Sequence, residues 1–70
     1  MKRVLVKSSA VRSVGYYDAS ATLEVELTTG RVYRYFDVPW EVHDELMDAS
    51  SMGGYYNTRI KPAYHCEEVG

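Results

Sequence analysis

The chain is short of the residues that small proteins use as covalent staples. Its 70 residues include a single cysteine, Cys66, so no disulfide can form within the chain. A lone cysteine is typical of a reducing compartment, and we therefore expect a cytoplasmic protein. A chain of this size buries only about 60% of its unfolded surface, so we expect one domain over residues 1–70 with a modest core.

Long hydrophobic runs are also missing. The apolar stretch near the start, Val4–Val6, is too short for the hydrophobic region of a signal peptide, and nothing approaches a membrane span. We therefore expect no membrane partner. Eight basic residues against ten acidic ones give a net charge of −2. This balance argues against general binding to nucleic acid, which depends on the neutralisation of phosphates.

What the chain does contain is a β-hairpin at its centre. Leu23, Val25 and Leu27 alternate with polar residues, which indicates a strand with one buried face. Thr28-Thr29-Gly30 follows and fits a three-residue loop that needs glycine at its left-handed position. The return strand then carries Tyr33 and Tyr35 on one face, and the loop length decides whether they join the core.

Two registers of this hairpin are open. A two-residue turn at Thr29-Gly30 would set Arg34 opposite Val25, a cation against a core residue. We predict the three-residue loop, because it buries both tyrosines and opposes unlike charges on the wet face. It gives three cross-strand pairs: Val25 with Tyr33, Leu23 with Tyr35, and Glu24 with Arg34.

The flanking segments predict further strands and two helices. Residues 4–17 form a strand, or two strand pieces, with a bulge near Arg12-Ser13, and residues 63–69 a short last strand. A first helix should follow Asp37, which can cap it, and a second should run over residues 52–60. We predict an α+β fold: a three- to four-stranded antiparallel β-meander covered on one face by two helices. The expected core is Leu23, Val25, Leu27, Tyr33, Tyr35, Val42, Leu46, Tyr56 and Ile60.

Six fragments of the chain carry a resemblance to a known family. They are Val6-Lys7-Ser8-Ser9, Val14-Gly15-Tyr16, Thr22-Leu23-Glu24-Val25, Gly30-Arg31-Val32-Tyr33-Arg34-Tyr35, Val38-Pro39 and Ser51-Met52-Gly53-Gly54-Tyr55-Tyr56-Asn57. In this order they resemble the KTSC domain, whose hallmark Tyr-x-Tyr corresponds to Tyr33 and Tyr35. The family is a small module at the C-terminus of some lysyl-tRNA synthetases, also found as a free-standing bacterial or phage protein.

The resemblance spans nearly the whole chain and implies a domain with no catalytic residue to carry over. RNA binding is suggested for the family because of the synthetase association. We therefore expect a small non-enzymatic binding module whose ligand is RNA or a nucleotide. The alternative is a protein–protein interaction or self-association module without a nucleic-acid ligand.

Two groups of residues are candidates for the ligand site. Ser51, Gly53, Gly54 and Asn57 surround the start of the second helix, where exposed N–H groups can bind an anion, with Arg59 nearby. Ordinary helix capping explains the same residues and stays open as an alternative. The second group is a base-stacking platform formed by Tyr16, Tyr33 and Tyr35 with Arg31 and Arg34. In the predicted register the rings of Tyr33 and Tyr35 face the core, away from Arg34.

A candidate interaction surface consists of Phe36, Trp40 and Met47, large apolar residues outside the expected core. Exposed apolar groups that cluster together mark contact sites. We expect this surface to serve a protein partner or a second copy of the chain.

Catalysis and metal binding find little support in the sequence. Ser8-Ser9 lacks the glycine run of an oxyanion hole and a third group to orient a base. His65-Cys66 provides no paired ligand spacing for zinc. The acidic residues of the first helix are typical of a solvated helix face. We expect no catalytic residue, no metal site and no cofactor.

Overall fold

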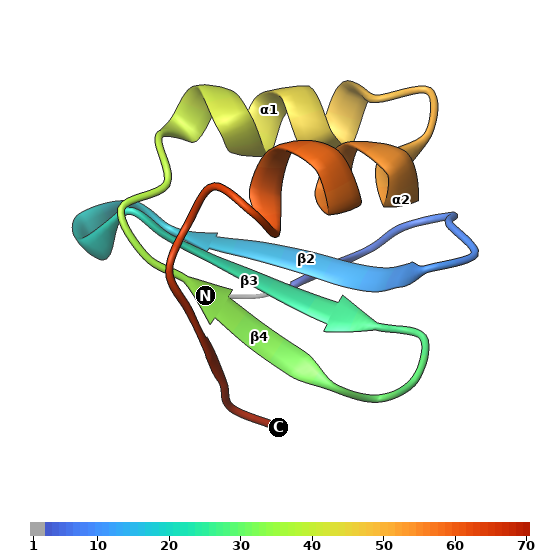
Figure 1. Cartoon of the computed structure of the whole chain (residues 1–70), viewed down its shortest axis with the longest axis horizontal. Helices are drawn as coiled ribbons and strands as arrows, with labels where there is room; N and C mark the ends of the chain where they lie inside the picture. The colour runs from blue at the N-terminus through green and yellow to red at the C-terminus, as the bar shows by residue number, and fades with distance from the viewer. Residues whose placement is uncertain (1–2) are drawn as a thin grey trace.

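The computed structural model describes residues 3–70, which form one antiparallel sheet and a helical layer on one of its faces (Figure 1). The strands are β1 (Val4–Leu5), β2 (Val11–Tyr17), β3 (Thr22–Leu27), β4 (Val32–Tyr35) and β5 (Cys66–Glu68). The helices are η1 (Asp18–Ser20), α1 (Trp40–Asp48), α2 (Met52–Tyr55) and η2 (Tyr56–Ile60), a π-helical continuation of α2.

Strand order in the sheet follows chain order, β1-β2-β3-β4-β5, with every pair antiparallel. The predicted α+β meander covered on one face by two helices is confirmed. Within residues 3–70 the sheet has five strands rather than three or four, because each end of the chain adds a short edge strand. The expected bulge in β2 is confirmed by a register shift between Val11 and Ser13.

The central hairpin has the predicted register. Gly30 adopts φ +96°, and its N–H donates to the Leu27 carbonyl at 3.0 Å, so the loop has three residues. The cross-strand pairs are Leu23 with Tyr35, Glu24 with Arg34, and Val25 with Tyr33. Only a residue without a side chain reaches this φ without strain, which is why Gly30 fixes the register.

The core lies between the sheet and the helices and contains most of the expected residues. Leu27, Tyr33 and Val42 are only half-buried and pack against its edge. Four residues were not expected there: Val11, Val14, Tyr16 and Val38. The buried hydrophobic residues are Val11, Val14, Tyr16, Leu23, Val25, Tyr35, Val38, Leu46, Tyr56 and Ile60.

Two buried tyrosine hydroxyls are satisfied inside this core. The hydroxyls of Tyr35 in β4 and Tyr56 in the helical layer lie 2.5 Å apart, with their rings edge to face. The Tyr16 hydroxyl donates to the Val38 carbonyl at 2.6 Å. Burial raises the pKa of all three phenols, so each stays protonated and able to donate.

The start of α1 differs from the expectation that Asp37 caps it. Asp37 adopts φ +56°, a left-handed conformation that turns the chain away from β4, and helix α1 begins only at Trp40. Pro39 occupies the N-cap position and makes no side-chain cap hydrogen bond. Asp37 is therefore a turn residue, a role that aspartate tolerates better than most residues.

His43 of α1 lies in an aromatic cluster. Its ring stacks on Trp40 at 4.5 Å between centroids and lies 5.4 Å from the Tyr16 ring. Its Nδ1 atom is buried and has no hydrogen-bond partner. Burial disfavours the charged imidazolium and lowers the pKa of His43 from its usual 6.5, although Asp44 and Asp18 oppose this effect.

Replacing Tyr35 by Phe should lower the free energy of unfolding by about 1–3 kcal/mol, because the Tyr56 hydroxyl is then buried without a partner. The double variant Tyr35→Phe with Tyr56→Phe should cost less than the sum of the two single variants. Urea unfolding of the four proteins gives the coupling between the hydroxyls. Losses that simply add would contradict a direct bond.

The lowered pKa of His43 predicts a loss of stability in mild acid. As the pH falls below about 6.5, the unfolded chain binds a proton at this residue before the folded protein does. The free energy of unfolding should therefore decrease from pH 7.5 to 5.5. In thermal unfolding across this range, the stability of the His43→Asn variant should depend less steeply on pH than that of the unmodified protein. An unchanged slope would show that other groups cause the effect.

Candidate functional site

A polar hollow of about 410 Å³ lies between the turn that joins β1 to β2 and the start of α2. We call it the serine groove. It is lined by residues 7–10 on one side and residues 50–54 with Asn57 on the other. The structure therefore brings together Ser51, Gly53, Gly54 and Asn57, the four residues that the sequence places around the start of the second helix.

Local hydrogen bonds shape both walls of the serine groove. The Ser8 hydroxyl accepts bonds from the N–H groups of Ala10 and Val11 at 3.2 and 3.3 Å, which closes the turn before β2. The Ser51 hydroxyl accepts a bond from the Gly54 N–H at 3.2 Å, so Ser51 caps α2 as expected. Both serines thus have structural roles as well as facing the groove.

Gly53 lets the two walls approach each other. A Cβ atom at this position would lie 3.1 Å from the Ala10 Cβ, closer than ordinary van der Waals contact. Any side chain here would push the turn away from α2 and change the shape of the groove. This close approach explains a glycine in a helix, where glycine costs about 1 kcal/mol relative to alanine.

The charge of the serine groove is positive. Among the described residues that line it, Lys7 is the one charged residue, and it is exposed. A neighbouring hollow of about 450 Å³ lies across Ser50-Ser51 and carries the carboxylates of Glu45 and Asp48. An anion would therefore be attracted to the Lys7 side and repelled from the other.

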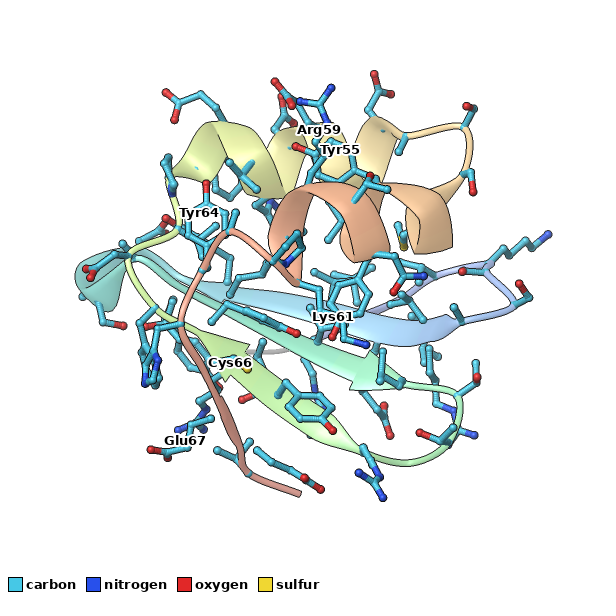
Figure 2. All side chains as sticks on the ribbon, viewed as in Figure 1. Tyr55, Arg59, Lys61, Tyr64, Cys66 and Glu67 are labelled. Atoms are coloured by element: carbon cyan, nitrogen blue, oxygen red, sulfur yellow. The ribbon has the colours of Figure 1, made fainter. Side chains whose placement is uncertain are left out.

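Arg59, the expected cation of this site, is not among the residues that line the groove. Figure 2 shows Arg59 beside Tyr55 on the outer side of the helical layer, away from the sheet. The Tyr55 hydroxyl donates to Glu45 at 2.7 Å, and burial with this bond raises the pKa of Tyr55 to about 12. The sequence left Arg59, Lys61 or a basic residue from the first strand open as the cation of this site, and Lys7 is the one that lines the groove.

Arg34 lies on the uncovered face of the sheet. Its Nε atom contacts the Glu24 carboxylate at 2.8 Å, and this bond raises the pKa of Arg34. The Nε atom of Arg3 also lies 3.1 Å from the Glu24 carboxylate, and the Tyr17 hydroxyl donates a hydrogen bond to it at 3.3 Å. Although Glu24 is buried, its charge is therefore compensated by two arginines. The expected pairing of Glu24 with Arg34 is confirmed.

A second hollow, of about 360 Å³, lies where β2, β3 and β4 meet η1. We call it the aromatic hollow. Its lining includes Tyr17, Arg34, Phe36 and Asp37. The guanidinium carbon of Arg34 lies 5.4 Å from the centre of the Tyr17 ring, a cation–π contact. The sequence did not indicate this hollow, because the predicted stacking platform uses tyrosines that face the core.

Of the three residues expected to form an exposed apolar interaction surface, two are less exposed than expected. Met47 is half-buried and packs against the core, and Phe36 is half-buried with its ring 6.1 Å from that of His65. Trp40 alone of the three is exposed, at 50% of its surface. A single exposed aromatic residue is ordinary on a protein surface and does not by itself define a contact site.

Among residues 3–70, His, Cys, Asp and Glu side chains nowhere gather in threes that could hold a metal ion. The same part of the chain has no helix with the length and apolar character needed to cross a bilayer.

Comparison with known proteins places this geometry in a family. The family model for the KTSC domain matches residues 7–64. A relative from Stutzerimonas stutzeri is 45% identical over 65 residues, which cover 93% of this chain and 92% of the relative. A lysine–tRNA ligase from Nostoc punctiforme is 33% identical over 63 residues, 90% of this chain but 11% of the ligase.

The solved structures agree with this assignment. A crystal structure of a KTSC domain protein from Yersinia pestis superposes with a TM-score of 0.95 at 32% identity, covering 99% of this chain and 97% of that one. Sequence and fold thus lead to the same conclusion: the chain belongs to the KTSC domain family.

Proposed function

We propose that this domain is a non-enzymatic binding module that holds a phosphate of RNA or of a nucleotide in the serine groove. The observation that carries the proposal is the local charge. In a protein of net charge −2, the groove has Lys7 and several hydroxyls in its lining and no carboxylate among its described residues. A cation surrounded by hydroxyl and N–H donors is suited to a phosphate.

The size of the groove agrees with a small ligand. At about 410 Å³ it falls within the usual range of small-molecule sites, about 300–1,000 Å³. Asn57 adds a side-chain amide, which can donate to a phosphate oxygen or accept from a ribose hydroxyl. One nucleotide, free or within an RNA strand, fits this combination of groups.

The absence of a reactive pair supports a binding role over catalysis. Among the residues that line the groove, none is a histidine or a carboxylate that could act as base for Ser8, Ser9 or Ser51. Ser8 and Ser51 are already held as acceptors of backbone N–H groups. We place the module in the cytosol, where RNA is abundant and the exposed Cys66 stays reduced.

The family relatives favour RNA as the polyanion. A lysine–tRNA ligase carries a segment 33% identical to this chain, and that enzyme acts on tRNA. A protein partner or a second copy of the chain is the alternative. It has less support, because of the three residues expected to form its contact surface only Trp40 is exposed.

Replacing Lys7 by Gln should weaken binding of a short single-stranded RNA and of AMP about tenfold, because one charge-assisted phosphate contact is lost. Fluorescence anisotropy with labelled RNA, and heteronuclear NMR titration with AMP, measure the two affinities. The plot of log affinity against log salt should also become shallower by about 0.7. Asn57→Ala should weaken the binding of both ligands without changing this slope.

The matched control is Arg59→Gln, which removes the same charge outside the groove and should leave both affinities unchanged. Equal losses in Lys7→Gln and Arg59→Gln would show charge attraction without a site. If neither ligand binds at 50 mM salt, the proposal fails. A dimer in sedimentation that Trp40→Ser abolishes would then favour the protein alternative.

A further inference from the structure

We infer that the aromatic hollow on the uncovered sheet face is a nucleobase site, which takes a base that bears an exocyclic amino group. Four of the residues that line the hollow support this assignment: Tyr17 and Phe36 have flat rings, Arg34 has a planar guanidinium, and Asp37 has a carboxylate. They come from the end of β2, from β4 with the residue after it, and from the turn before α1. The inference is independent of the serine groove, because a base without phosphate can test it.

The planar groups supply the affinity. Bases stack on aromatic rings and on arginine, and each such contact contributes about 1–3 kcal/mol. Phe36 is half-buried, so one part of its ring is held by the protein while the rest stays accessible. The hollow measures about 360 Å³, within the range of small-molecule sites of about 300–1,000 Å³.

Arg34 is held in place before any ligand arrives. Its Nε atom binds Glu24 at 2.8 Å, and Glu24 is itself buried and held by Arg3 at 3.1 Å. The Tyr17 hydroxyl reaches the same carboxylate at 3.3 Å. Arg34 and Tyr17 are thus fixed against each other by one buried acid, and a ligand need not order them.

Asp37 supplies the selectivity. Its carboxylate only accepts hydrogen bonds, so it favours a base edge that donates, such as the amino group of cytosine. Uracil presents a carbonyl oxygen at the same position, and the carboxylate should repel it. Asp37 has a left-handed backbone, with φ +56°, and belongs to a turn that lines the hollow.

The experiment is a heteronuclear NMR titration of the whole chain with cytidine and with uridine, which differ at C4, an amino group against a carbonyl, and at N3, an acceptor against an N–H donor. We expect cytidine to shift the amide signals of Tyr17, Arg34 and Phe36 and to leave those of residues 7–10 unmoved. Uridine should bind at least fivefold more weakly. Lys7→Gln should change neither titration, which separates this site from the serine groove.

Three conservative variants test the parts. Phe36→Leu keeps an apolar side chain, and Arg34→Lys keeps the charge beside Glu24. Each should still weaken the binding of cytidine about fivefold or more, because a flat stacking surface is lost. Asp37→Asn should remove most of the preference for cytidine, and asparagine tolerates the left-handed backbone. Urea unfolding checks that each variant is folded.

Two outcomes would overturn the inference. One is the absence of saturable shifts at these residues with either nucleoside. The other is tighter binding of N-acetyl-tryptophanamide than of cytidine in the same hollow, which would assign it to an aromatic side chain of a protein. A loss of phosphate binding in Lys7→Gln with cytidine binding intact would support two separate sites.

Discussion

The bond between the Tyr35 and Tyr56 hydroxyls fixes how the helical layer sits on the sheet. A buried phenol must find a partner, and each of these two finds it in the other. Tyr35 is anchored by its pairing with Leu23, so the position of Tyr56 follows from the sheet. The start of α2 lies one helical turn earlier, which brings Gly53 against Ala10 and forms the serine groove. The groove therefore depends on a contact in the protein interior.

Net charge is a poor guide to the surface of this protein. Glu24 and Glu26, in the middle of the uncovered sheet face, are paired with Arg3, Arg12 and Arg34. Most remaining carboxylates lie along α1 and in β5. The turn before β2, with Lys7, is left without a nearby acid in its groove. An overall charge of −2 thus coexists with a local cationic site, which composition alone cannot reveal.

The hairpin and its register could be predicted because they depend on local features. Alternation in β3 and one glycine at a left-handed position leave a single arrangement that turns both tyrosines toward the core. The roles of Tyr16 and Val38 could not be predicted in the same way. The two residues meet in the core, where the Tyr16 hydroxyl donates to the Val38 carbonyl across 22 positions of the chain. The prediction that Asp37 caps the first helix was wrong because an aspartate before a helix is typical both of a cap and of a turn.

The candidate site was predictable only in part. Four residues of the serine groove lie within one short segment, and helix capping chemistry draws attention to them. Arg59 was expected to join them, but neighbouring helix residues point in different directions, and Ile60 takes the inward one. The aromatic hollow combines residues from the end of β2, the end of β4 and the turn before α1. No spacing in the sequence indicates that these segments meet.

The two hollows lie on opposite faces of the sheet and towards opposite ends of β2. A seven-residue strand spans about 20 Å, so a single nucleotide cannot occupy both. A ligand that reaches both hollows must be a nucleic-acid strand of several nucleotides that passes around an edge of the sheet. Once one nucleotide of such an oligonucleotide is bound, binding of a second nucleotide in the other hollow is intramolecular. The overall affinity then increases with the effective concentration of the tethered base. Two weak sites of this kind favour an oligonucleotide over a free nucleotide without requiring strong binding at either one.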